Sequence, residues 1–106
     1  MQRPKNLPKV PTEAFSLLGP VPVNHEDLSG ERLFGQFRSV ERVIRVHDDM
    51  RNETKWQTYW HEVGHLILHD AGISNDMRSA LEERVVDAFG LYLTAAMRAG
   101  FLKVTP

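Results

Sequence analysis

Apolar residues recur at three- and four-residue intervals along two long stretches of the chain. The first stretch covers residues 55–70 and the second covers residues 79–99, and this spacing is typical of helices with one apolar face. Ser79 and Glu82 have the spacing of a capping box, and Gly100 is placed to end the second helix. The second half of the chain is therefore predicted to form two long amphipathic helices.

The first half of the chain has a different pattern. Residues 33–37 and 42–46 alternate between polar and apolar and are bounded by turn residues, which predicts a short hairpin. Residues 1–30 are expected to form an extended arm with one short helix near residues 13–18, because they contain Pro4, Pro8, Pro11, Pro20 and Pro22. We expect an α+β domain over residues 31–106, in which a small antiparallel or mixed sheet packs on two long helices.

Composition narrows the class of protein further. A chain of 106 residues makes one domain with a modest core. The net charge of −1, with both signs interspersed, argues against direct nucleic-acid binding. The absence of cysteine excludes disulfides and thiolate ligands and suits a reducing compartment. No apolar run approaches 18 residues and no apolar signal core follows the start, so we expect a cytoplasmic protein without membrane association.

The first predicted helix contains the pentapeptide His61-Glu62-Val63-Gly64-His65, which matches H-E-x-x-H. Side chains four residues apart project from one face of a helix, so His61 and His65 can each present a ring nitrogen to one Zn²⁺ ion. Glu62 lies a quarter-turn away, where its carboxylate can reach a water on the metal without binding the metal itself. The pattern predicts two zinc ligands and a general base.

A third ligand is expected from the second predicted helix. Catalytic zinc normally has three protein ligands, and Glu83 is our candidate for the third. Asp87 falls one turn later on the same face, where it can accept a hydrogen bond from a zinc-bound imidazole. Alternatively, both acids belong to a solvated helix surface. The upstream histidines favour the first interpretation, because zinc needs a further ligand.

His69 extends the histidine series but is not predicted to bind the metal. Residues eight apart on a straight helix are separated by about 12 Å, whereas the ligands of one zinc ion lie within about 3.5 Å of each other. We expect His69 instead to stabilise the end of the first helix, near Gly72, where a cation is favoured.

Several other residues have more than one interpretation. Gly64 and Gly90 lie inside predicted helices, which suggests close approach of the two helices. The strand at 42–46 is a candidate outermost strand that receives a substrate backbone, or else part of a purely structural sheet. Four aromatic residues are expected to line the core or the cleft: Trp56, Trp60, Phe89 and Tyr92. Four side chains could stabilise an oxyanion, and the sequence does not choose among His25, His47, Tyr59 and Tyr92.

The residues from Thr58 to His69, followed by those from Glu83 to Gly90, resemble the ImmA/IrrE family of zinc metallopeptidases. The hairpin from Gly35 to Val46 is also similar, so the resemblance covers about residues 30–95. It implies a zincin-type minidomain of the gluzincin class, with Asp87 standing where the family more often has asparagine. Members are often paired, in bacteria and phages, with a helix-turn-helix repressor that they cleave.

We therefore predict a single-domain zinc-dependent metallopeptidase that hydrolyses a peptide bond in a protein or peptide substrate, such as a helix-turn-helix transcription regulator. One alternative is a regulatory module that keeps the zinc fold and binds its partner with little hydrolysis. Another is a scaffold with a structural metal. The presence of Glu62 argues against the scaffold, because a structural zinc site has no use for a base beside its ligands.

Overall fold

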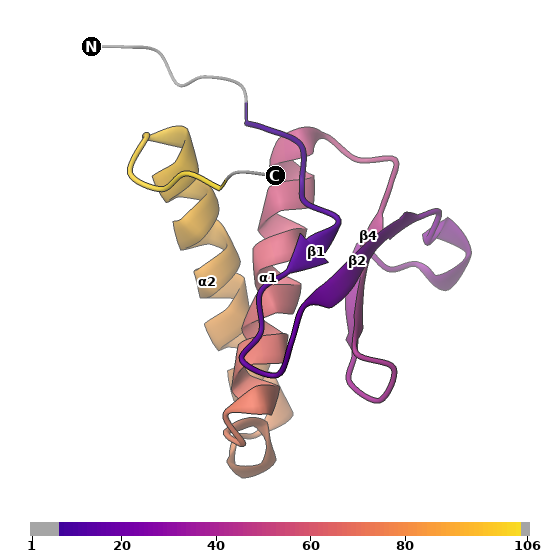
Figure 1. Ribbon diagram of the computed structural model, residues 1–106, viewed down its shortest axis with the longest axis vertical. Coiled ribbons are helices and arrows are strands. Elements are labelled where there is room, and N and C mark those ends of the chain that lie inside the picture. The colour runs from indigo at the N-terminus through magenta and orange to yellow at the C-terminus, as the bar shows by residue number, and fades with distance from the viewer. Residues whose placement is uncertain (1–6, 105–106) are drawn as a thin grey trace.

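A four-stranded sheet and two long helices make up the computed structural model, which describes residues 7–104 (Figure 1). This is the α+β fold expected from the sequence, with helices close to their predicted positions. In chain order the elements are β1 (Glu13–Ala14), β2 (Val21–Glu26), the 3-10 turn η1 (Ser29–Glu31), β3 (Gly35–Arg38), β4 (Val43–His47), α1 (Asn52–Asp70), the 3-10 turn η2 (Ser74–Asp76) and α2 (Ser79–Arg98).

The sheet is mixed, with the strand order β1-β2-β4-β3. Strands β3 and β4 form the expected hairpin, but β4 also pairs in parallel with β2, so that it lies inside the sheet. The prediction that residues 42–46 form the outermost strand is therefore wrong. The edge strand on this side is β3, which leaves one of its backbone edges unpaired.

The proline-rich segment contributes to the sheet within the described residues; Pro4 lies outside them. The helix predicted near residues 13–18 is wrong, because Glu13–Ala14 form β1 and a turn follows, closed by a bond from the Gly19 N–H to the Ser16 carbonyl. In β2 the buried side chains of Val21 and Val23 alternate with exposed ones, the period of a strand.

The three layers of the molecule are the sheet, α1 and α2. Helix α1 packs on β3 and β4 with one side and on α2 with another (Figure 1). Among the elements of residues 7–104, α2 makes extensive contact with α1 alone. The core lies mostly between the sheet and α1, around the fully buried side chains of Trp56, Leu66, Ile44 and Val46. Neither described helix is both long and apolar enough to cross a membrane.

Both helices end in the same way. Gly72 and Gly100 have φ angles of +76° and +83°, and the next residues, Ile73 and Phe101, donate their N–H groups back to carbonyls five positions earlier. The predicted stop at Gly100 is thus confirmed. The predicted capping box is wrong, because Arg78 is the N-cap residue of α2 and makes no side-chain cap.

The expected close approach of the two helices occurs at both glycines. A β-carbon on Gly64 would lie 2.8 Å from Val86 Cγ1, and one on Gly90 would lie 2.7 Å from the backbone oxygen of Gln57. Any larger residue at either position would push α2 away from α1.

A polar network fixes the far end of α1. Arg42 donates to both carboxylate oxygens of Asp70, at 2.8 and 2.9 Å, and also to the Ser16 hydroxyl. Ser16 in turn donates to Asp70 at 2.7 Å. The segments around Ser16 and Arg42, which are distant in the sequence, are joined in this way to the C-terminus of α1.

Candidate metal centre

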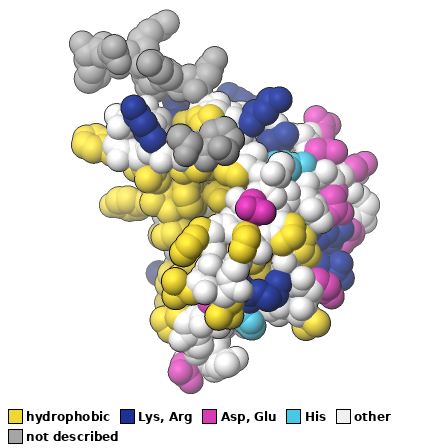
Figure 2. Space-filling model, viewed as in Figure 1, with side chains coloured by type: hydrophobic (Ala, Val, Ile, Leu, Met, Phe, Trp, Pro, Cys, Tyr) yellow, Lys and Arg dark blue, Asp and Glu magenta, His cyan; other side chains and the backbone are white. Residues whose placement is uncertain are grey.

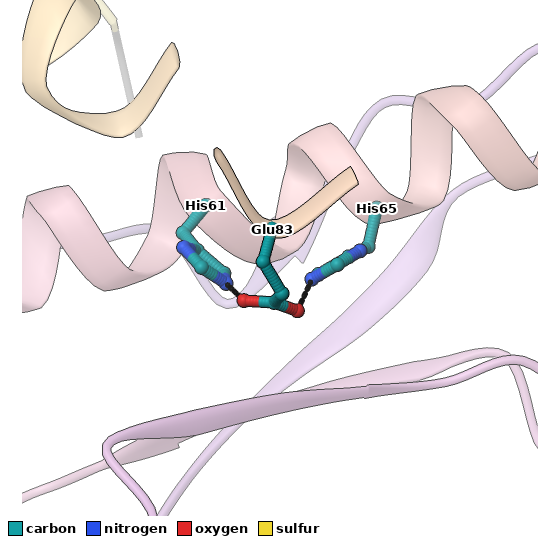
Figure 3. A group of neighbouring side chains, drawn as sticks. All are labelled: His61, His65 and Glu83. Atoms are coloured by element: carbon teal, nitrogen blue, oxygen red, sulfur yellow. Dashed lines mark ion pairs between the residues drawn. The ribbon is translucent and has the colours of Figure 1, made fainter. Parts of the chain in front are cut away.

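The structure brings His61, His65 and Glu83 together at the face where α1 meets α2 (Figure 3). Glu83 places one carboxylate oxygen 3.3 Å from His61 Nε2 and the other 2.9 Å from His65 Nε2. One donor atom from each residue lies within 4.8 Å of the other two, so that a small shift of the side chains would let all three bind one metal ion. The three predicted ligands therefore converge on one point.

Each imidazole also has a carboxylate partner on its other nitrogen. His61 Nδ1 lies 2.9 Å from Asp87 Oδ1, which is the position expected for Asp87. His65 Nδ1 lies 2.5 Å from Glu82 Oε2. A carboxylate on Nδ1 fixes the tautomer that leaves Nε2 free to bind a metal, and it raises the basicity of the ring.

Glu82 is the site residue that the sequence analysis missed, having assigned it to a capping box. Burial acts to raise the pKa of Glu82, but the hydrogen bond with His65 and smaller contributions from Ser74 and His69 together outweigh burial, so that the pKa is lowered. The carboxylate side chain is only 15% exposed, whereas Glu83 and Asp87 are more than half exposed. The contact with His65, made by a side chain with little exposure, identifies Glu82 as part of the site.

Glu62 lies beside this cluster in a nearly enclosed position. The residue is 6% exposed, and its Oε2 atom is 3.9 Å from His61 Nε2. Burial raises the pKa of Glu62 to about 7, against a hydrogen bond from the Phe37 backbone that lowers it. A cation bound at the site would lower the pKa of Glu62. Such a carboxylate can both accept and release a proton near neutral pH.

Strand β3 reaches Glu62 because of Gly35. A β-carbon at this glycine would lie 2.4 Å from Thr58 Cγ2 and 3.3 Å from Glu62 Cγ. A glycine inside a strand indicates such a close approach, although the sequence does not say to which residue. The edge strand therefore runs directly past the general base.

An open groove crosses the site between β3 and the helices. Leu33, Gly35, His61 and Glu62 line both of its halves, which have volumes of about 530 and 480 Å³. The first half is further lined by Arg32, Phe34, Gln57 and Leu91, among others. The second half is more polar, with Gln36, Ser39, Ser74 and Glu82 among its lining residues.

Some residues singled out in the sequence lie elsewhere. His69 is in the last turn of α1, as expected, and its ring packs edge-on against Phe37 in the second half of the groove. None of the four candidates for oxyanion stabilisation lines either half: His25, His47, Tyr59 and Tyr92. Trp56 and Tyr59 are buried in the core, whereas Tyr92 is 80% exposed, so the expectation that it lines the core or cleft is wrong.

The donor set suits a divalent cation. Four carboxylates, from Glu62, Glu82, Glu83 and Asp87, surround two imidazoles whose Nε2 atoms both face Glu83. A divalent cation would offset the mutual repulsion of carboxylates gathered at this distance. Two imidazole nitrogens and one carboxylate oxygen are a ligand set that zinc takes in hydrolytic sites.

A second group of potential ligands, Asp27, His47 and Asp48, is already used by the protein. His47 Nδ1 accepts the N–H of Leu28, and Asp27 accepts hydrogen bonds from both the backbone and the hydroxyl of Ser29. These bonds shape the loop after β2, so the group is a structural cluster.

Comparison with known protein families gives one match. The profile of peptidase family M78, described as the IrrE N-terminal-like domain, matches residues 20–98. This range is most of the chain and contains β2 to α2, including every residue of the candidate metal centre. No curated protein and no solved structure matches the chain significantly.

Proposed function

Since the chain belongs to the IrrE N-terminal-like family of peptidases, M78, we propose that it is a zinc-dependent metallopeptidase that hydrolyses a peptide bond in a protein substrate. The observation that carries the proposal is the convergence of His61, His65 and Glu83 donor atoms within 4.8 Å of one another, beside the buried carboxylate of Glu62. A structural metal site would not need that carboxylate.

His61, His65 and Glu83 would hold the ion, and Glu82 and Asp87 would orient the two imidazoles. When bound, zinc polarises the carbonyl of the substrate and makes a water molecule more acidic. Glu62 accepts the proton of the attacking water and then donates it to the nitrogen of the leaving amine. Its pKa near 7 in the site without a metal suits a group that must do both.

The free edge of β3 is the proposed seat of the substrate backbone. An extended peptide can pair with an unpaired strand, which positions its carbonyl groups at fixed intervals. Strand β3 runs next to Glu62, as the hydrogen bond from the backbone N–H of Phe37 to that carboxylate shows. A peptide on this edge would extend along the groove, with side chains in both halves.

We further propose that the substrate is a helix-turn-helix transcription regulator in the cytoplasm. This follows from the resemblance to the ImmA/IrrE family and from a near-neutral chain that is not built for direct contact with nucleic acid. The groove is open to solvent and extends along β3, which suits an extended segment of a protein better than a small molecule.

The test is to incubate the zinc-loaded chain with the regulator encoded beside it and to follow cleavage by mass spectrometry. Glu62→Gln should keep zinc and fold and lose activity by several powers of ten. Glu41→Gln, at an exposed carboxylate paired with Arg38, is the matched control and should cleave like the wild type. A complex that forms without cleavage would instead favour the regulatory binding module.

A further inference from the structure

The outer face of α2 is apolar along its whole length. Six positions recur at intervals of four and three residues on the side turned away from α1: Leu81, Val85, Ala88, Tyr92, Ala95 and Ala99. Leu81 and Val85 are each 41% exposed and Tyr92 is 80% exposed. Figure 2 shows hydrophobic side chains gathered on the side of the molecule that α2 forms. We call these six positions the α2 stripe.

The other sides of α2 pack against α1 or contribute to the metal centre. Val86, Gly90, Thr94 and Met97 are buried, and they lie on the opposite side of the helix from the stripe. Glu83 and Asp87 reach the metal centre from α2. A helix with apolar residues on both its inner and its outer faces is typical of a helix that is covered on both. Among the described elements only α1 covers α2 extensively.

We propose that the α2 stripe pairs with the same stripe of a second copy of this chain, with the two helices antiparallel. In a two-fold arrangement centred near Gly90, Leu81 faces Ala99 of the other copy and Val85 faces Ala95. Tyr92 then faces Ala88. Each large side chain meets an alanine, so the two stripes are complementary in shape, as an interface with two-fold symmetry requires.

The area of the stripe fits a dimer that can dissociate. The stripe is about 27 Å long at 1.5 Å per residue, and pairing along it would bury on the order of 1,100 Å² in total. Specific interfaces begin at about this size, and we expect a dissociation constant in the micromolar range. No charged side chain belongs to the stripe, so pairing buries no unpaired charge.

The arrangement leaves the metal centre accessible. The α2 residues that line the groove are Glu82, Glu83, Asp87, Gly90 and Leu91, and none of them belongs to the stripe. Pairing would hold the helix that carries Glu83 from its outer side as well as from α1.

Sedimentation equilibrium of the zinc-loaded full chain, from about 1 to 200 μM, tests the proposal. The wild type should shift from the 12.1 kDa monomer to twice that mass. Tyr92→Glu should raise the dissociation constant at least about 100-fold, since two charges enter the interface of each dimer. The exposure of Tyr92 means that fold and zinc content should not change. Val40→Glu, at an apolar residue 90% exposed in the hairpin turn, is the matched control and should dimerise like the wild type.

Cysteine crosslinking tests the direction of pairing, because the chain has no cysteine of its own. In the antiparallel arrangement residue 85 lies opposite residue 95, whereas two copies of residue 85 are about 15 Å apart. Oxidation should therefore join the double variant Val85→Cys/Ala95→Cys into covalent dimers and leave each single variant without a covalent crosslink.

Three results would overturn the proposal. The first is a wild-type chain that stays monomeric at the highest concentration. The second is a dimer that Tyr92→Glu does not weaken. The third is efficient crosslinking of Val85→Cys alone, which would mean a parallel pair or a different surface.

Discussion

At the scale of single residues, the metal centre depends on four carboxylates that have different tasks. Glu83 faces both Nε2 atoms, and Asp87 and Glu82 each contact an Nδ1 atom. Glu62 is buried beside them. Because the Nδ1 atom of each imidazole contacts a carboxylate, the Nε2 lone pairs of both rings point toward the same place. The site is thus largely preorganised for a cation.

Glu82 is expected to contribute to zinc affinity through His65. Glu82→Ala should weaken zinc binding by about 10–100-fold, since the imidazole loses its orienting partner. Glu82→Gln should have a smaller effect, because its amide oxygen still accepts from Nδ1. Competition with a chelator measures both affinities, and Glu41→Ala is the control. Unchanged affinity in Glu82→Ala would mean that the 2.5 Å contact does not position the ring.

Asp87 is expected to act in the same way on His61. Asp87→Ala should lower zinc affinity by about 10–100-fold while keeping the helix intact, because alanine is a good helix former. Asp87→Asn should lower zinc affinity less, because its amide oxygen can still accept a hydrogen bond from His61 Nδ1. If alanine and asparagine both match the wild type in chelator titrations, Asp87 is ordinary helix surface.

Some residues of the metal centre could be predicted from the sequence and Glu82 could not, for a physical reason. His61, Glu62 and His65 are placed relative to one another by a single helix, whose geometry is known in advance. Glu83 and Asp87 were found because zinc requires a third ligand and one helical turn separates them. Glu82 could not be assigned, since its place behind His65 depends on how the two helices are packed against each other.

At the scale of elements, Gly90 sets the distance between α1 and α2. Gly90→Ala should lower the unfolding free energy by about 1–2 kcal/mol, since a clash with the backbone oxygen of Gln57 outweighs the gain in helix propensity. Zinc affinity should also fall, because α2 carries Glu83. Chemical denaturation and chelator titration measure the two effects. Gly30→Ala, where a β-carbon meets nothing within 4 Å, is the control and should change neither.

Asp70 should make the stability of the α1 terminus depend on pH. The hydrogen bonds from Arg42 lower its pKa to about 2, below the value of 3.8 expected for the unfolded chain. The ionised form is therefore the stabilised one, and its contribution is complete above the unfolded value and is lost as the pH falls from about 4 to about 2.

Comparison of the wild type with Asp70→Asn isolates this contribution. The variant should be less stable near pH 7 in urea denaturation, and the difference between the two proteins should shrink at about pH 3. A difference of the same size at both pH values would mean that Asp70 stabilises the loops by packing and not by its charge.

The order of the strands in the sheet was misjudged because it depends on contacts between distant segments. The helical periods of α1 and α2 are local, and both helices were predicted to within three residues at either end. Strand β2 shows the alternation of a strand at Val21 and Val23, but the prolines around it favoured an arm. Its parallel pairing with β4 is what makes β3 the edge strand, and no local pattern reveals that pairing.

At the scale of the whole molecule, zinc would join α1 to α2 in addition to the packing between the two helices. Two of the predicted ligands are on α1 and one is on α2, and α2 makes extensive contact with no other described element. An ion that binds only when both helices are in place stabilises the folded chain, because the unfolded chain does not hold the three ligands together.

Thermal unfolding with and without zinc measures this link. At a free zinc concentration about 100 times the dissociation constant, the gain should be about 2.7 kcal/mol, which corresponds to a rise in Tm of roughly 10–20 °C for a domain of this size. Glu83→Ala should lose most of the rise, since it removes the only ligand on α2. Glu62→Gln should keep it, because the general base does not bind the ion. An equal rise in Glu83→Ala would mean that the metal is held by α1 alone, and that the two helices are not joined through it.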